Sequence, residues 1–288
     1  MSEPDFMTDK GRKPKLIAPP KSCDTHSHIY GPLDQFPRAN SSTRLATLEA
    51  YRSMLTRLGI ERCVVVHSSA YGFDNSVTLD AIAQIGQDRA RGMAVIPSDI
   101  SKEELQILHA GGMRGVRVSG HSTDLSAFDA DKIAAQIADL GWALQLQEPT
   151  PGWVQKISPM VKNLPIPTIF DHLGTSPINE NTTGKEFRAL VKLLEDNDHV
   201  WVKIAAIYSN SNTGPPDYVD VGDRVRVLTQ TRPNRIIWGV NWPHPHFKFN
   251  GVAESADVLD PLLDWIPEET TRKLVLADNP GRLYGFDP

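Results

Sequence analysis

SCDTHSHI, at residues 22–29, is the stretch that decides the fold, because a short β-type run ends there in a cluster of polar side chains. Runs of this kind, bounded by turn or polar residues, predict strands. Seven more follow, at residues 63–69, 92–97, 115–119, 143–147, 168–172, 200–204 and 235–239. Segments with helical spacing of apolar residues alternate with them, at residues 45–58, 77–90, 102–110, 129–140, 187–194 and 222–231.

This alternation predicts a parallel sheet with helices on its outside. Eight strands in a chain of 288 residues favour closure into a (β/α)8 barrel of the TIM type. An open, doubly wound sheet is the alternative. The first strand is not followed by a Gly-x-Gly-x-x-Gly motif and the sequence has no Walker loop, so the nucleotide-binding reasons for an open sheet are missing.

The domain organisation is simple. Residues 1–21 are expected to be a flexible leader, polar and rich in proline and lysine, and residues 22–288 a single barrel domain. The leader lacks the apolar core of a signal peptide, and no stretch reaches the roughly 18 apolar residues that span a membrane. Cys23 and Cys63 each lie beside an apolar run, which predicts buried free thiols as in a reducing compartment. We therefore expect a cytoplasmic protein.

The charge balance limits the partners. A net charge of −5 gives no reason to expect nucleic acid or an anionic membrane as a partner. It does not exclude an anionic small molecule, because the local charge of a site can oppose the global one. The sequence does not determine the oligomeric state.

Polar side chains gather where the predicted strands end, and active sites lie at these ends in a parallel barrel. His26 and His28 are two residues apart on one strand, so both project from the same face. His172 ends the sixth strand, and the three imidazoles together predict a functional cluster rather than a polar surface loop. Further polar groups at strand ends suit an anionic, hydroxyl-rich ligand: Arg117, Lys203 and Asn241, with Ser69, Tyr71 and Gln147 as second choices.

Five stretches together resemble the amidohydrolase superfamily: DTHSH at 24–28, RGVR at 114–117, DHLG at 171–174, WGVNWPHP at 238–245 and DNPGRLYGF at 278–286. The WGVNWPHP block, followed by the terminal segment, is far more specific than the His-x-His pair. Within the superfamily the chain is most similar to the branch of 2-pyrone-4,6-dicarboxylate lactonase and D-galactarolactone isomerase. The resemblance runs from about residue 22 to the C-terminus and implies a barrel that acts on lactones.

The chain departs from the metal-dependent members of that superfamily. Those resemble one another in the His-x-His pair, a carboxylated Lys or Glu on strand 4, His on strands 5 and 6, and Asp on strand 8. Here the fourth, fifth and eighth strands offer Arg117, Gln145 or Gln147, and Asn241. A guanidinium beside the histidine pair would repel a divalent ion. We therefore predict no metal and no other cofactor, as the lactonase-like branch implies, although three histidines alone can hold zinc.

Asn241 favours one reaction over another. The Asp at this position in the hydrolytic relatives resembles a general base, and an amide cannot accept a proton at neutral pH. A hydroxyl of the lactone itself, in contrast, is held near the carbonyl at high effective concentration. We expect intramolecular transesterification of D-galactaro-1,5-lactone to the 1,4-lactone. The resemblance to galactarolactone isomerases places this isomerase reaction in hexuronate and aldarate catabolism, as in galacturonate degradation.

The predicted roles follow from this reaction. The three histidines would hold the lactone carbonyl and stabilise its oxyanion, and Arg117 would grip the pendant carboxylate as a bidentate fork. Lys203 would add a second positive charge, and Asn241 would position the ring or the attacking hydroxyl. Asp24 is expected to orient one histidine, and Asp171 to point to the opposite face of its strand.

Alternatives remain for the residues and for the function. Arg117 would pair with Glu148, and Lys203 with Asp171, if both were purely structural. The first rival function is a metal-independent lactone hydrolase of the 2-pyrone-4,6-dicarboxylate lactonase type, with a histidine as base. The others are a metal-dependent decarboxylase or hydrolase and a barrel that binds a sugar acid without turning it over.

Overall fold

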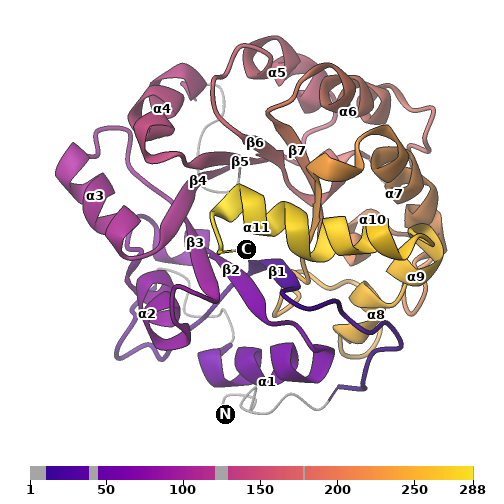
Figure 1. The fold of residues 1–288 in the computed structure, drawn as a ribbon, viewed down its shortest axis with the longest axis horizontal. Coiled ribbons are helices and arrows are strands. Elements are labelled where there is room, and N and C mark those ends of the chain that lie inside the picture. Colours follow the sequence, from indigo (N-terminus) through magenta and orange to yellow (C-terminus); the bar gives the residue numbers. More distant parts are fainter. Residues whose placement is uncertain (1–10, 39–44, 121–128, 178, 288) are drawn as a thin grey trace.

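The computed structural model describes residues 11–38, 45–120, 129–177 and 179–287, and eight strands there form one parallel sheet. The strands follow chain order around the sheet, with the helices outside them (Figure 1). This arrangement confirms the predicted (β/α)8 barrel. The strands are β1 Cys23–Ser27, β2 Arg62–Val66, β3 Ala90–Ala94, β4 Met113–Ser119, β5 Ala143–Gln147, β6 Thr168–Phe170, β7 Val200–Ile204 and β8 Ile236–Trp238.

All six predicted helical segments are helices in the structure; the one at 102–110 has the predicted bounds, and the other five differ at one or both ends. One strand-following helix was not predicted, α5, whose internal Pro159 weakens the helical signal. Four short helices follow β8. The helices are α1 Leu48–Leu58, α2 Ser76–Ile85, α3 Lys102–Ala110, α4 Ala130–Ile137, α5 Trp153–Val161, α6 Lys185–Asp196, α7 Val219–Thr231, α8 Ala256–Leu259, α9 Leu262–Trp265, α10 Glu269–Lys273 and α11 Asn279–Tyr284.

The apolar core has two parts. The larger part lies between the strands and the surrounding helices. The smaller part fills the barrel near the beginnings of the strands, where Trp201 and Ile237 pack with Leu283, Tyr284 and Phe286 from the C-terminal segment. Figure 1 shows α11 lying across the middle of the barrel. Because this segment closes the amino-terminal mouth of the barrel, the polar site lies at the opposite end.

The barrel closes where β1 meets β8, the first and last strands of the sheet. Two backbone hydrogen bonds join their ends, from Asn241 N to His26 O (2.7 Å) and from His28 N to Trp242 O (2.8 Å). Gly239 lets the strands approach, because a Cβ there would lie 2.6 Å from the backbone N of His26.

Asp24 completes this closure with its side chain. Its Oδ1 accepts hydrogen bonds from the backbone N–H groups of Val240 (2.8 Å) and His26 (3.1 Å), and its Oδ2 accepts one from the Tyr51 hydroxyl (2.8 Å). The carboxylate is completely buried, so three donors that water cannot reach depend on it. Asp24 therefore ties β1 to β8 and to α1 at once.

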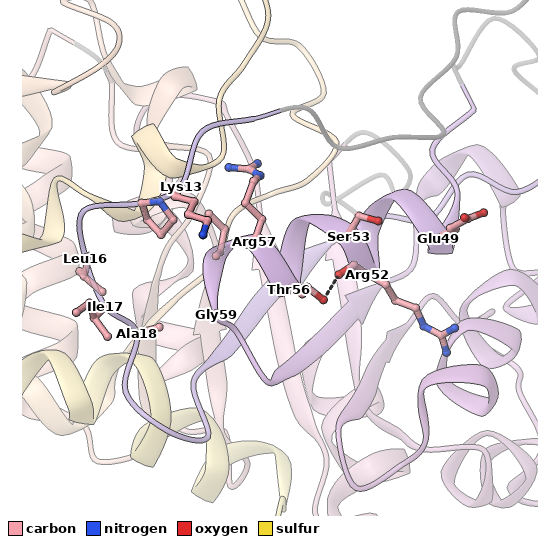
Figure 2. Close-up of a pocket in the computed structure, with 12 residues that line it drawn as sticks. Lys13, Leu16, Ile17, Ala18, Glu49, Arg52, Ser53, Thr56, Arg57 and Gly59 are labelled. Atoms are coloured by element: carbon pink, nitrogen blue, oxygen red, sulfur yellow. Dashed lines mark hydrogen bonds between the residues drawn. The ribbon is translucent and has the colours of Figure 1, made fainter.

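The described part of the N-terminal leader packs against the barrel domain. Leu16 is buried, and Arg12 forms ion pairs with Asp257 (2.7 Å) and Asp260 (2.6 Å). Residues 13–18 run beside α1 and leave a shallow groove between them (Figure 2). Among the described residues, no helix is both long enough and apolar enough to cross a bilayer.

Replacing Asp24 is expected to weaken the fold strongly. The Asp24→Ala change leaves three buried donors without an acceptor, each at about 1–3 kcal/mol, so we expect a loss of about 3 kcal/mol or more in the free energy of unfolding. Asp24→Asn keeps one acceptor oxygen and should lose less. Urea unfolding at about pH 8 measures both, since burial raises the pKa of Asp24 to about 6 and the group is charged there.

The exposed Asp139 provides the matched control, because surface substitutions usually change stability by less than about 0.5 kcal/mol. If Asp24→Ala is no less stable than Asp139→Ala, the carboxylate does not hold the barrel closed.

Candidate functional site

Three histidine rings meet at the carboxyl-terminal end of the barrel. The ring centroids of His26 and His28 are 5.0 Å apart, and those of His26 and His172 are 4.8 Å apart. His26 is completely buried and the other two nearly so. The structure therefore brings together the three histidines that the sequence singles out.

His26 faces this cluster because β1 is irregular. The pairing register between β1 and β2 shifts between Asp24 and Ser27, as at a β-bulge. Asp24 lies before the shift and bonds to Tyr51 of α1, whereas His26 Nδ1 lies 3.5 Å from Asp171 Oδ1 in the site. The prediction that Asp24 orients a histidine ring is wrong, because side-chain alternation does not continue through a bulge and the carboxylate binds backbone N–H groups instead.

His172 joins the cluster through a change of backbone conformation. The strand β6 ends at Phe170, earlier than predicted, and His172 has a left-handed φ of 52°. Such a conformation is strained for a residue other than glycine and recurs at functional sites. The prediction that Asp171 points away from His172 is wrong, because strict alternation holds only in extended backbone.

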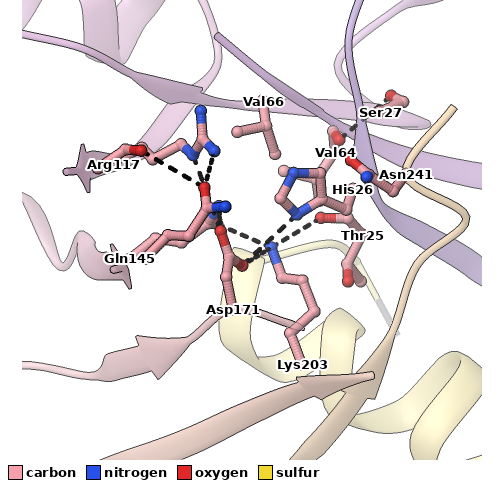
Figure 3. A network of polar contacts seen from close by, with 12 residues as sticks. Thr25, His26, Ser27, Val64, Val66, Arg117, Gln145, Asp171, Lys203 and Asn241 are labelled. Carbon is pink, nitrogen blue, oxygen red and sulfur yellow. Dashed lines mark hydrogen bonds and ion pairs between the residues drawn. The ribbon is translucent and has the colours of Figure 1, made fainter. Parts of the chain in front are cut away.

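Asp171 lies at the centre of a buried polar network (Figure 3). Its Oδ1 is 3.4 Å from Lys203 Nζ, and its Oδ2 is 3.8 Å from Arg117 Nε and accepts a hydrogen bond from Gln145 Nε2 at 2.7 Å. Burial alone would raise the pKa of this carboxyl, but Lys203 and His26 outweigh it and hold the pKa well below its usual range. Asp171 is thus a permanent anion under the site.

Lys203 is directed at protein groups. Its ammonium donates to Thr25 O (3.0 Å) and Gln145 Oε1 (2.7 Å) and lies next to Asp171. Two of its three N–H donors are therefore bound to these oxygens, and the ammonium forms an ion pair with Asp171 Oδ1 at 3.4 Å. Lys203, predicted as a substrate contact, is fully buried and positions Asp171.

Arg117 lies nearer the mouth of the site. Its Nη2 donates to Gln147 Oε1, so two predicted residues form a pair. Glu148, the structural partner considered for Arg117, instead accepts from the backbone N of Thr150 (2.9 Å). Within the described ranges, the guanidinium therefore has one carboxylate neighbour, Asp171, and this carboxylate also forms an ion pair with Lys203.

The imidazoles are neutral at physiological pH. Burial, with a smaller contribution from Arg117, lowers the pKa of His28 to about 3, and burial lowers that of His172 to about 4. Burial also lowers the pKa of His26 well below 6.5. His28 Nδ1 lies 2.8 Å from Val66 O, which can only accept, so Nδ1 carries the proton and Nε2 keeps its lone pair.

Asn241 stands at the end of β8 beside His26 (Figure 3). Its φ of 61° is left-handed, a conformation that asparagine tolerates better than most residues. Its Nδ2 donates to the Tyr208 hydroxyl at 2.6 Å, and its Oδ1 is buried. Tyr208 follows β7 in a short 3-10 turn and carries no sequence motif, so sequence reasoning missed it.

Buried polar atoms without a hydrogen bond converge here. Buried groups are nearly always paired in folded proteins, so such a concentration points to a ligand site. Within the described part of the chain, the atoms at this end of the barrel that lack a hydrogen bond are His26 Nδ1 and Nε2, His172 Nδ1, Arg117 Nε, Asp171 Oδ1 and Asn241 Oδ1.

The remaining predicted contacts lie at the edge. Ser69 is exposed, and Tyr71 is largely buried with its hydroxyl accepting from Gly31 N (3.1 Å). Tyr71 stacks with Tyr30 at 6.3 Å between centroids, and the Tyr30 ring lies 6.4 Å from that of His28. Tyr30, two residues after His28, is a neighbour of the site that sequence reasoning overlooked.

A family model with the description Amidohydrolase matches residues 23–286. The chain belongs to the amidohydrolase family. Three curated relatives fall in the lactone branch that the sequence motifs indicate. They are a 4-sulfomuconolactone hydrolase of Hydrogenophaga intermedia (33% identical, 94% of this chain, 91% of the relative), a 2-pyrone-4,6-dicarboxylate hydrolase of Comamonas testosteroni (30%, 94%, 92%) and a D-galactarolactone isomerase of Agrobacterium fabrum strain C58 (31%, 96%, 96%).

The fold of this amidohydrolase is also close to a solved structure. A protein of Agrobacterium tumefaciens, in its apo form, superposes with a TM-score of 0.87 at 27% identity and covers 98% of this chain and 99% of its own. The family resemblance therefore extends over the entire barrel.

Many amidohydrolases hold divalent metal ions, and His26, Asp171 and His172 offer ligand atoms within 4.8 Å of one another. Both oxygens of Asp171, however, face cations, Lys203 Nζ at 3.4 Å and Arg117 Nε at 3.8 Å. A divalent ion bound by this carboxylate would lie beside two positive charges in a buried site. The donor set therefore does not fit a divalent metal.

The three histidine rings are expected to stay neutral between about pH 5.5 and 8, because their lowered pKa values put protonation below this window rather than near 6.5. Ring nitrogen signals in 15N NMR, assigned with single His→Gln variants, measure this directly. The His28 signals should also show the proton on Nδ1. A titration midpoint near 6.5 for any of the three would contradict the buried, neutral cluster.

Proposed function

We propose that this amidohydrolase is a lactone isomerase that converts D-galactaro-1,5-lactone to the 1,4-lactone without a metal. The named reactions of its relatives support lactone chemistry, since they comprise two lactone or pyrone hydrolases and one galactarolactone isomerase. The arrangement of side chains around Asn241 supports isomerisation rather than hydrolysis.

Asn241 carries the proposal. An amide stands at the strand-8 position, and neither carboxylate close to it is free to act as a base. Asp24 points outward into hydrogen bonds with Val240, His26 and Tyr51, and Asp171 is paired with cations. Among the described residues, water therefore finds no strong base to deprotonate it, whereas a hydroxyl of the bound lactone attacks from within the same molecule.

The reaction balances without an added reactant. The 4-hydroxyl oxygen of the lactone forms a bond to the carbonyl carbon C1, and the bond from C1 to the ring oxygen on C5 breaks. The proton of the 4-hydroxyl ends on the departing C5 oxygen. His28 Nε2, an acceptor because Nδ1 is bound to Val66 O, relays this proton. With a pKa of about 3, His28 holds the proton only during the transfer.

The other residues stabilise charge and orientation. His26 and His172 have ring nitrogens that make no hydrogen bond, and an N–H from each stabilises the oxyanion that develops on the carbonyl. Arg117, held by Gln147, binds the pendant carboxylate. Asn241 binds the sugar ring. Lys203 and Asp171 fix His26 and Arg117 in place.

A hydrolase is the second candidate. The same Nε2 of His28 that would relay a proton could also draw a proton from water, and so could the unpartnered Nδ1 of His172. Two of the relatives are named as hydrolases. The pKa of about 3 makes His28 a weak base for deprotonating water. For this reason we favour isomerisation over hydrolysis as the proposed reaction.

The deciding experiment follows the products of freshly prepared D-galactaro-1,5-lactone by NMR, with and without a strong chelator. We expect the 1,4-lactone to accumulate before free galactarate, at a rate that the chelator does not change. Direct appearance of the open diacid would establish the hydrolase. Loss of turnover on chelation would make the histidines metal ligands and overturn the metal-free mechanism.

The Asn241→Asp variant tests the role of the amide. A carboxylate at this position can accept a proton from water, so we expect hydrolysis to galactarate to appear beside isomerisation. The ratio of diacid to 1,4-lactone, measured by NMR at equal conversion, reports the change. Asn241→Ser serves as the control, since it is polar but not basic. An unchanged ratio in Asn241→Asp would show that Asn241 is not the reason for isomerisation.

A further inference from the structure

Tyr208 is the direct partner of Asn241. It lies in the 3-10 turn Ile207–Asn210 after β7, and its side chain is completely buried. Its hydroxyl donates to Pro245 O at 3.1 Å and accepts from Asn241 Nδ2 at 2.6 Å. Both partners belong to the segment that follows β8, so one phenol holds two points of that loop.

The single proton of this hydroxyl fixes the orientation of the amide. Pro245 O can only accept, so the phenol proton points to it, and the phenol oxygen is left as an acceptor. The amide group that faces this oxygen must therefore be the NH₂. Burial raises the pKa of Tyr208 further above 10, so the phenol keeps its proton.

The amide oxygen of Asn241 consequently points away from Tyr208. It is buried and has no hydrogen-bond partner among the described residues. The backbone N–H of Asn241 donates to His26 O at 2.7 Å, so Asn241 lies beside a histidine whose ring nitrogens make no hydrogen bond. A buried acceptor without a hydrogen bond destabilises the protein until a donor binds it.

We propose that Tyr208 is a positioning residue that holds the Asn241 amide with its oxygen toward the substrate, where it accepts a hydrogen bond from a ring hydroxyl. This inference rests on the proposed function and assigns the specificity of the same site. The hydroxyl involved is not the nucleophile, whose proton passes to His28. The position selects a ligand that donates there, a polyhydroxylated lactone, over a flat ring that offers only acceptors.

The Tyr208→Phe variant removes the acceptor and frees the amide to rotate. We expect KM to rise about tenfold with little change in kcat, because the hydroxyl contact is made in the bound substrate and in the transition state alike. In an Asn241→Ala background, adding Tyr208→Phe should not raise KM any further. Tyr218→Phe, which alters another buried tyrosine, is the matched control and should behave as wild type.

Two results would overturn the inference. If Tyr208→Phe raises KM by the same factor in the wild-type and Asn241→Ala backgrounds, the tyrosine stabilises the loop and does not act through Asn241. If wild-type protein with 15N-labelled asparagine shows both side-chain protons of Asn241 in fast exchange with water, the amide is not held. The NMR measurement does not require that the variant folds.

The inference can fail separately from the proposed function. A wild-type enzyme that hydrolyses the lactone would overturn the isomerase assignment. The double-mutant cycle of Tyr208→Phe and Asn241→Ala could still be measured on the hydrolysis reaction. If the effects of Tyr208→Phe and Asn241→Ala on KM are additive in an active isomerase, Tyr208 does not position Asn241. The isomerase assignment would still hold.

Discussion

The closure of the barrel depends on one buried carboxylate. Eight parallel strands form a barrel only if the first and last are joined, and here few backbone hydrogen bonds join them. Asp24 supplies acceptors for backbone groups on both strands and for a hydroxyl on α1. The same segment carries the bulge after Asp24, and the bulge turns His26 into the site. The junction that closes the fold therefore also shapes the candidate site.

Charge in the site is arranged around Asp171. One carboxylate faces two cations, Lys203 below it and Arg117 beside it, and all three are buried. Removal of a single member would leave an unpaired charge in a region of low polarity, which is far costlier than the pair is stabilising. The two cations outnumber the one carboxylate, which agrees with the proposal of an anionic substrate and no metal. The imidazoles stay neutral in this environment and can donate to an oxyanion.

The sequence predicted the architecture well because barrel formation depends on repeated local patterns. Extended runs such as those at residues 143–147 and 200–204, separated by helical segments, are enough to indicate eight strands with helices outside. The strand-end rule then placed His26, His28, His172 and Asn241 at one mouth. The helix α5 was missed because Pro159 lowers its propensity, while tertiary packing of its apolar face stabilises it.

What the sequence by itself determined was the fold, the family and the types of side chain at the site. Only the tertiary structure decided the directions and pairings of those side chains. A bulge after Asp24 and a left-handed backbone at His172 overturned the predictions from alternation, since both break the two-residue period. Tyr208 joined the site only through space, because hydrogen bonds between loops that follow different strands depend on how the barrel closes. Local sequence patterns do not encode how loops after different strands approach one another.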